Sequence, residues 1–451
     1  MSRRIFGIET EYGVTVGDPD GSNAEIDAEE AARTLFASAL EKTRSTNLFL
    51  RNGGRLYLDV GAHPEYATAE CDQLWDLLAQ VRAGAQMLAE MASEADLGGR
   101  RHIHLFANNL DFEGSSYGCH ENYLLRRSRD FRAMVDSLVS FFVTRQVIAG
   151  AGDLRTDQVG ETRYVLSARA DQMQDAVSAA TTRSRPIVNT RDEPLGDASS
   201  YRRLHVIVGD TNVAEPTTAL KVASADLVLS AVEQGVDFSD LELADPMAAI
   251  RTISQDLSGS AKLLLADGRE LSAAEIQDQY RSRVRAQLDP EDELYGYLFD
   301  LWGRAIRAFA SGDWQGIDTE IDYAIKKKLI DGYLERQGST LSDPRVARLL
   351  LAYHDITAGG LAPKMEDAGL MVRLTSPQQV RSAKNAPPQT TRAKLRGEAI
   401  AAAEDARRAL GVDWVNLRVQ GSPLQMALQD PFATEDPRVD ELLRDMRQEV
   451  S

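Results

Sequence analysis

The sequence predicts an α+β protein, in which strands lie mainly in the first half of the chain and helices lie between and after them. Three observations support this class. Short segments of alternating apolar and polar residues recur in the first half, residues 275 to about 351 have helical periodicity, and the strands follow one another too closely for a regular βαβ series. With 451 residues, 43% of them hydrophobic, the chain can bury a large core.

The first half of the chain alternates between predicted strands and helices. Residues 4–15 alternate apolar and polar side chains and predict a strand. A helix follows, because Asp27 can cap it and Glu30 completes a capping box. Its apolar stripe consists of Ala31, Ala32, Leu35, Phe36, Ala39 and Leu40. We then expect strands over 55–60 and 101–106 and helices over 72–92 and 132–148.

The second half begins with one more alternating strand and is then mostly helical. Residues 201–209 predict that strand, and a helix follows from about 216 to 233. Asp267-Gly268 predicts the turn of a hairpin over 262–271.

A change in composition predicts the domain boundary. Residues 375–389 are rich in turn-forming residues and contain several prolines, which is typical of a linker. We therefore expect a large domain over residues 1–380 and a small C-terminal domain over residues 381–451.

Charge and hydropathy restrict the kinds of partner. The chain has 51 basic and 69 acidic residues, and a net charge of −18 disfavours general binding to DNA or to an anionic membrane. No run approaches the roughly 18 apolar residues of a membrane helix. A pair of arginines near the N-terminus resembles an export signal, but Glu9 and Glu11 interrupt the apolar stretch that export requires. Cys71 and Cys119 are too few for a disulfide framework. We expect a cytoplasmic protein that binds no nucleic acid and no membrane.

Two predicted strands each carry polar residues on one face. The period of a strand places Glu9 and Glu11 on the same face of the first. In the strand over 55–60, Arg55, Tyr57 and Asp59 share one face, and Leu56, Leu58 and Val60 face the core. A single strand of this kind is more often a solvated face than a site. The mixture of arginine, phenol and carboxylate, followed closely by His63, Glu65 and Glu70, favours a site.

A third predicted strand also carries polar residues on one face, and together the three strands suggest one candidate site. Arg203 and His205 lie on one face of the strand over 201–209, opposite Leu204 and Val206. If the three strands share a sheet, one face collects Glu9, Glu11, Arg55, Tyr57, Asp59, Arg203 and His205. Carboxylate oxygens suit Mg²⁺, and arginines suit the charge of a phosphoryl group. The pattern therefore predicts a nucleotide site on a sheet, and neither a P-loop motif nor a GxGxxG motif after a strand is present.

Two other groups of residues are weaker candidates. His102 and His104 lie two residues apart on a predicted strand and could ligate a metal, but an exposed strand is the favoured interpretation. Cys119 beside His120 suggests thiol chemistry, but a small residue at a tight turn over 117–120 is favoured.

Several long motifs are spread over nearly the whole chain. They are Gly7-Ile8-Glu9-Thr10-Glu11-Tyr12-Gly13, Arg55-Leu56-Tyr57-Leu58-Asp59-Val60-Gly61, His63-Pro64-Glu65-Tyr66-Ala67-Thr68-Ala69-Glu70, Gly118-Cys119-His120-Glu121-Asn122-Tyr123-Leu124, residues 180–186, Asn189-Thr190-Arg191-Asp192-Glu193-Pro194, residues 201–210, 318–322, 353–356 and 387–397. These motifs resemble the family of Pup ligases and depupylases, which act on the small protein modifier Pup.

The resemblance implies a fold and a set of roles. The family is similar to glutamine synthetase-like carboxylate–amine ligases, whose curved antiparallel sheet, flanked by helices, holds ATP and Mg²⁺. A small C-terminal domain would contribute to the nucleotide site. Position by position, the resemblance assigns Mg²⁺ to Glu9, Tyr57 and Glu65, and places His205 in the same site. It assigns ATP to Arg55, Thr68 and Trp414, with Arg203 beside them. Asp59 would be the catalytic base.

The resemblance also separates the two activities of the family. The depupylases carry a long loop before the Arg-Leu-Tyr strand, whereas only residues 14–54 lie there in this chain. Residues 58–61 and Cys119 also match the ligases. We therefore expect an ATP-dependent ligase that joins the C-terminal glutamate of Pup to lysines of substrate proteins. A depupylase or deamidase, a glutamate–amine ligase for small molecules, and a nucleotide-binding regulator remain alternatives.

Overall fold

The structure is a computed structural model that describes residues 3–17, 27–43, 45–59, 61–95, 102–111, 114–128, 131–179, 185–419 and 425–448. Its central element is a sheet of eight described strands in the order β10-β11-β12-β7-β1-β5-β4-β3. Neighbouring strands are antiparallel, except β10 and β11. The strands are β1 (Phe6–Glu11), β3 (Asn47–Phe49), β4 (Arg55–Leu58), β5 (Pro64–Ala67), β7 (Cys119–Arg126), β10 (Asp175–Ser178), β11 (Pro186–Asn189) and β12 (Tyr201–Val206). The predicted α+β class and the antiparallel sheet are confirmed.

The first predicted strand is broken into two. It leaves the large sheet after β1, and β2 (Gly13–Gly17) pairs instead with β6 (His102–Phe106) in a sheet of two strands. Gly13 permits this departure, because a Cβ at that position would overlap the Tyr117 hydroxyl. The tight approach of Tyr117 therefore requires a glycine where the chain changes sheets.

The helix expected after Asp27 is present but interrupted. Asp27 caps α1 (Ala28–Leu35) by accepting a hydrogen bond of 2.8 Å from the Glu30 backbone N–H. The backbone leaves the helical conformation at Phe36, and α2 (Ala37–Thr43) follows. Its apolar residues face a cluster under β4 and β5 that includes Leu35, Phe36, Leu56 and Tyr66.

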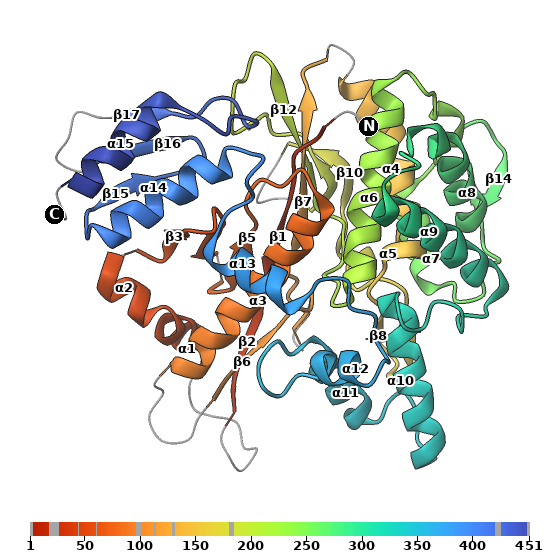
Figure 1. Ribbon diagram of the computed structural model, residues 1–451. Coiled ribbons are helices and arrows are strands. Elements are labelled where there is room, and N and C mark those ends of the chain that lie inside the picture. The colour runs from red at the N-terminus through yellow and green to blue at the C-terminus, as the bar shows by residue number, and fades with distance from the viewer. Residues whose placement is uncertain are drawn as a thin grey trace.

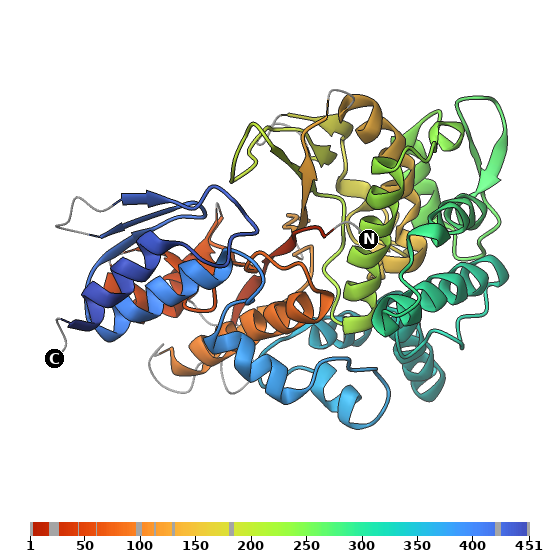
Figure 2. The same ribbon diagram turned by 45° about the horizontal axis from the view of Figure 1, so that its top comes forward.

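One face of the large sheet is buried beneath helices (Figures 1 and 2). Phe6 and Ile8 of β1 and Leu204 and Val206 of β12 share one core with these helices. The covering helices include α4 (Phe131–Thr144), α5 (Gln146–Ala149), α6 (Glu215–Glu233), α8 (Ala273–Val284) and α9 (Glu293–Ser311). Because α6 is buried from Glu215 to Ala231, it shows no amphipathic stripe.

The predicted helices and hairpin of the second half are confirmed. β13 (Lys262–Leu264) and β14 (Glu270–Ser272) pair around Gly268, whose φ of 88° requires glycine at this turn. The remaining helices of this part are α7 (Pro246–Gln255), α10 (Asp322–Gln337), α11 (Pro344–His354), α12 (Ala362–Asp367) and α13 (Pro377–Asn385). α3 (Leu74–Glu94) lies beside α13, far from it in sequence (Figure 1).

The C-terminal residues build a smaller unit at one end of the molecule (Figures 1 and 2). α14 (Ala393–Asp405) and α15 (Pro437–Gln448) pack on a sheet formed by β15 (Leu410–Val412), β16 (Asn416–Val419) and β17 (Gln425–Ala427). Residues between Leu395 and Met446 form a hydrophobic cluster of their own. This cluster favours a separate C-terminal unit, and the boundary at residue 380 stays a prediction.

Candidate functional site

The polar face of the large sheet brings together strands that are far apart in sequence. β12, β7, β1, β5 and β4 are consecutive neighbours. In β1, Phe6, Ile8 and Thr10 are buried, while Glu9 and Glu11 are partly exposed on the opposite face. In β12, Leu204 and Val206 are buried and Arg203 and His205 are partly exposed. The predicted sharing of one sheet by the three polar strands is therefore confirmed.

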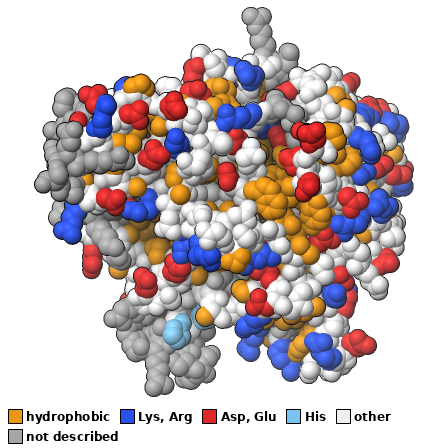
Figure 3. Space-filling view, viewed as in Figure 1, with side chains coloured by type: hydrophobic (Ala, Val, Ile, Leu, Met, Phe, Trp, Pro, Cys, Tyr) orange, Lys and Arg blue, Asp and Glu red, His pale blue; other side chains and the backbone are white. Residues whose placement is uncertain are grey.

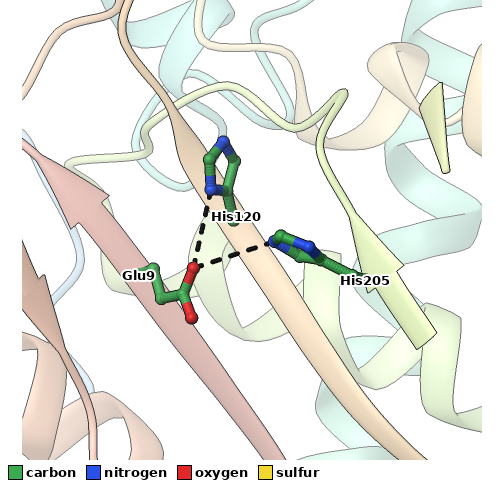
Figure 4. A group of neighbouring side chains, drawn as sticks. All are labelled: Glu9, His120 and His205. Carbon is green, nitrogen blue, oxygen red and sulfur yellow. Dashed lines mark ion pairs between the residues drawn. The ribbon is translucent and has the colours of Figure 1, made fainter. Parts of the chain in front are cut away.

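Glu9 lies between two histidines and an arginine on this face. Its carboxylate lies 3.6 Å from His120 Nδ1 on β7 and 3.7 Å from His205 Nε2 on β12 (Figure 4). Arg203 Nη1 is 3.9 Å from the other carboxylate oxygen. Burial alone would raise the pKa of Glu9, but the bond from His120 and the charges of His205 and Arg203 lower it to about 2. Glu9 is therefore an ionised carboxylate between two imidazoles.

A second group lies beside it and carries excess negative charge. Tyr57 on β4 faces Glu65 on β5 in register, and its hydroxyl donates to the Glu65 carboxylate. Burial, together with Glu9 and Glu11 nearby, raises the pKa of Glu65 to about 9. Carboxylate oxygens of Glu11, Asp59 and Glu65 lie within 4.8 Å of one another. Such a group is stabilised when a cation offsets its mutual repulsion.

The residues fit a divalent cation. Hard carboxylate oxygens from Glu11, Asp59 and Glu65 converge, and Glu9 lies in a separate group with His120 and His205. Carboxylate oxygen is the donor type that Mg²⁺ prefers. His205 Nε2 is buried without a hydrogen-bond partner and lies near Glu9, so it is available as a ligand. Of the four residues predicted to bind metal, Glu9 and His205 come together, and Tyr57 and Glu65 come together beside them.

Three residues of these groups were absent from the predicted metal set: His120, Glu11 and Asp59, the last of which was predicted as the catalytic base. The tight turn expected over 117–120 is wrong, because β7 begins at Cys119 and pairs with β1. The alternation of His120 and Asn122 on β7 is the signal that could have identified the strand. It was obscured by Glu121, a charged residue on the core face that is 0% exposed and paired with Arg145 at 2.5 Å.

A pocket of about 580 Å³ adjoins the Glu9 group. Thr68, Arg203 and Trp414 line it, together with Gly7, Glu9, Glu70, Pro194, Leu195 and Arg392, and the nucleotide role expected of the first three stays a prediction. Thr68 Oγ1 accepts a hydrogen bond of 3.1 Å from the Ile8 backbone N–H, which ties the chain after β5 to β1. Trp414 packs edge-to-face on Phe49 at 5.1 Å. The pocket therefore joins the sheet to the C-terminal unit.

Arg55, predicted to contact ATP, and Asp59 are not among the residues that line this pocket. The Arg55 guanidinium stacks 3.9 Å from the Tyr57 ring centroid and donates to Asn47 at 2.7 Å. Asp59 is exposed just beyond β4, and its backbone N–H donates to the His63 carbonyl at 3.0 Å. Val60 and residues 180–184, which belong to predicted strand and motif positions, lie outside the described residues.

The arrangement can bind a polyphosphate and activate a carboxylate. Trp414, Thr68, Arg203 and Glu9 line the pocket. Glu9 also lies beside the imidazoles of His120 and His205, and a cluster of carboxylates lies next to this group. Cations held by the carboxylates would offset phosphate charge, and Asp59 lies at the exposed edge where a nucleophile can approach.

Comparison with known proteins gives full-length matches. The family described as "Pup-ligase protein" matches residues 4–418. A Pup–protein ligase of Jonesia denitrificans is 48% identical over 464 residues, covering 100% of both chains. One of Saccharomonospora viridis is 50% identical over 458 residues, covering 99% of this chain and 100% of the relative.

Solved structures agree with these matches. The ligase PafA in complex with Pup has a TM-score of 0.92 at 41% identity, covering 100% of this chain and 92% of that chain. PafA in complex with ADP has a TM-score of 0.84 at 42% identity, covering 95% of each. Among the described residues, no helix is both long and apolar enough to cross a membrane.

Proposed function

The chain belongs to the Pup-ligase family, and we propose on that premise that it is an ATP-dependent ligase for Pup. It joins the side-chain carboxylate of the C-terminal glutamate of Pup to lysine ε-amines of substrate proteins. The full-length likeness to a ligase solved in complex with Pup carries this conclusion. The pocket beside the polar face agrees with it, because it offers a place for the nucleotide next to cation-binding carboxylates.

The first step activates the carboxylate. The glutamate carboxylate of Pup attacks the γ-phosphorus of ATP, the bond to the β-phosphate breaks, and an acyl phosphate and ADP form. Thr68 and Trp414 hold the nucleotide in the pocket, with Arg55 contributing from the neighbouring strand. Arg203 offsets the negative charge of the transferred group. Phosphate is a far better leaving group than oxide, which is why the step is needed.

The second step forms the isopeptide bond. A lysine ε-ammonium has a reference pKa of about 10.4 and must lose a proton before it can attack. Asp59 accepts that proton at the exposed edge of the carboxylate group. The amine nitrogen then bonds to the acyl carbon, and phosphate leaves with the electron pair of the broken C–O bond.

Magnesium is part of the proposal. Glu9, Tyr57, Glu65 and His205 would hold it, with His120 and Glu11 as neighbours. When bound, the ion supplies positive charge that stabilises the transferring phosphoryl group. We also place the protein in the cytoplasm, where ATP is available, and its two cysteines are free and buried in agreement with a reducing compartment.

The test is incubation of the protein with ATP, Mg²⁺, Pup ending in glutamate and a lysine-bearing protein, followed by intact mass measurement. The expected product has the summed masses of Pup and substrate less one water, with one ADP formed for each bond. If no conjugate forms and a supplied conjugate is cleaved, the chain is a depupylase. If free glutamate and a small amine are joined instead, it is a small-molecule ligase.

A further inference from the structure

Glu70 lines the pocket, yet the proposed chemistry gives it no role. It follows β5 within the motif that also supplies Glu65 and Thr68. Its side chain is 11% exposed and is shared by two arginines of the C-terminal unit. Arg392 Nε donates to it at 2.9 Å and Arg396 Nη1 at 3.0 Å, with a second, shorter bond from Arg396 Nη2.

Each arginine also donates hydrogen bonds to backbone carbonyls around the pocket. Arg396 donates to Gly53 O at 2.7 Å and to Trp414 O at 3.1 Å. Arg392 donates to Leu428 O at 2.9 Å and also to Leu195 O. Trp414 and Leu195 both line the pocket. One carboxylate thereby connects, through its two arginines, chain segments that are far apart in sequence.

The contact to Trp414 is the most direct. The Arg396 guanidinium lies 4.9 Å from the centroid of the Trp414 ring and holds the same residue by its carbonyl. The guanidinium is fully buried and has 0% exposure. Without Glu70 it would keep its charge in a dry site with no counter-charge from this carboxylate, so the arginine and the tryptophan would shift toward water.

We propose that Glu70 is a positioning residue for the nucleotide, which fixes the Trp414 and Leu195 walls of the pocket through Arg396 and Arg392. It acts on the affinity for ATP, whereas acyl transfer takes place beyond Glu9 on the sheet. This inference rests on the proposed nucleotide site. The Glu70 carboxylate stays ionised at neutral pH, because Arg396 and Arg392 outweigh burial and lower its pKa to about 2.

The ordinary alternative is a clamp that only stabilises the fold. The two roles predict different effects of substituting Glu70. If Glu70 is only a clamp, its substitution lowers the thermal midpoint and leaves the substrate affinities of the folded enzyme unchanged. If Glu70 positions the nucleotide, its substitution raises KM for ATP and leaves KM for Pup unchanged, because Glu70 and its two arginines hold the walls of the pocket proposed for the nucleotide.

The experiment uses Glu70→Gln in the full chain, with KM for ATP and for Pup measured separately by intact mass. We expect KM for ATP to rise by about tenfold or more, and KM for Pup to stay within about twofold. Difference fluorescence against Trp414→Phe should also show a shifted Trp414 emission in Glu70→Gln. The matched control is Glu320→Gln, because Glu320 is equally buried, is paired with Arg304 at 2.5 Å and lies outside the pocket lining.

Arg396→Lys tests the same inference should Glu70→Gln not fold. A lysine keeps the charge but cannot span Glu70, Gly53 O and Trp414 O together, so KM for ATP should rise selectively again. The inference is overturned if the folded variant has the ATP affinity of the wild type and loses only thermal stability, as Glu320→Gln does. Failure of the proposed function looks different, because the wild type itself would then form no conjugate, or Trp414→Ala would leave KM for ATP unchanged.

Discussion

Asp59 carries the clearest prediction for a single residue. Asp59→Asn keeps the size of the side chain and removes its capacity to accept a proton, so the amine stays protonated in the second step. We expect conjugation to fall by about 10²–10⁴-fold, the usual contribution of a general base. Binding of ATP should persist, because the pocket lining does not include Asp59. Single-turnover conjugation read by intact mass measures the effect, and full-rate ligation by the variant would exclude this role.

His104 gives a pH prediction away from the site. Among the weaker candidates, it proves to be a structural residue, since its Nδ1 lies 3.1 Å from Asp355 Oδ2. The hydrogen bond to Asp355, which outweighs burial, raises the pKa of His104 above 6.5. The group therefore adds stability that is full below the unfolded pKa of about 6.5 and is lost as pH rises through the higher folded pKa.

The measurement for His104 is the free energy of unfolding of wild type and His104→Asn between about pH 5 and 9. The difference between the two proteins should be largest below about pH 6.5 and shrink on the alkaline side. A difference that grows with rising pH would contradict the assignment, since it would require a lowered pKa.

At the same scale, the period of a strand was enough to predict which polar residues share the site. Glu9, Arg203 and His205 were grouped correctly, because alternation assigns each to a face once the strands are neighbours. His120 was missed for a physical reason. The core face of β7 carries Glu121, whose charge is neutralised by Arg145, and a single sequence gives no sign of a partner that lies 24 positions away.

At the scale of elements, the packing of α3 on the sheet gives a stability prediction. Gly84 faces the Tyr66 ring of β5, and a Cβ there would overlap the ring. Tyr66 cannot easily move, because its hydroxyl bonds Gln80 at 2.7 Å and accepts from Asn52 at 2.9 Å. Gly84→Ala should destabilise the protein by about 1–3 kcal/mol through overpacking, although alanine favours a helix.

The control for Gly84 is a glycine in a helix with open space around it. Gly296 in α9 has no atom within 4 Å of its ideal Cβ position. Gly296→Ala should therefore be neutral or stabilise by up to about 1 kcal/mol. Denaturant midpoints of the two variants measure these changes in stability. Equal effects at both positions would show that the Tyr66 ring moves aside without a cost in free energy.

The elements that the sequence predicted best were long helices and a hairpin with its own turn signal. Asp267-Gly268 fixes the hairpin locally, since Gly268 has φ of 88°. The strands missed were short and depend on neighbours. β5 has four residues, all buried, and shows no alternation. β1 ended early because Tyr117 occupies the space beside Gly13, which is a tertiary contact.

At the scale of the whole molecule, charge is spread and not gathered. Figure 3 shows acidic and basic side chains interspersed over the face in view, so the net charge of −18 forms no single acidic surface there. Three arginines, Arg203, Arg392 and Arg396, lie near the pocket, each beside a carboxylate of Glu9 or Glu70. An anionic nucleotide therefore needs a cation at the acidic groups beside the pocket, because the arginine charges there are already matched by carboxylates.

The convergence of distant chain segments on one pocket gives a prediction for ligand binding. Thr68, Arg203 and Trp414 come from three different segments, so a nucleotide that touches all of them stabilises the folded state as a whole. At a concentration of about 100 times Kd, Mg²⁺ and ATP should add about 2.7 kcal/mol to the free energy of unfolding and raise Tm. Thermal melts with and without the ligand measure this.

Removal of the metal ion tests whether the binding of ATP depends on a cation held by the carboxylates. With ATP present, EDTA should abolish most of the rise in Tm, because the carboxylates around Glu9 and Glu65 would then repel the phosphates with no cation between them. Glu320→Gln should keep the full Mg²⁺-dependent rise, since Glu320 belongs neither to the acidic groups nor to the pocket lining. Glu9→Gln should lose the Mg²⁺-dependent rise in Tm, because a neutral amide then replaces the carboxylate between His120 and His205. An ATP-induced rise that is unchanged in EDTA would mean that the nucleotide binds without a metal, and the acidic cluster would need another role.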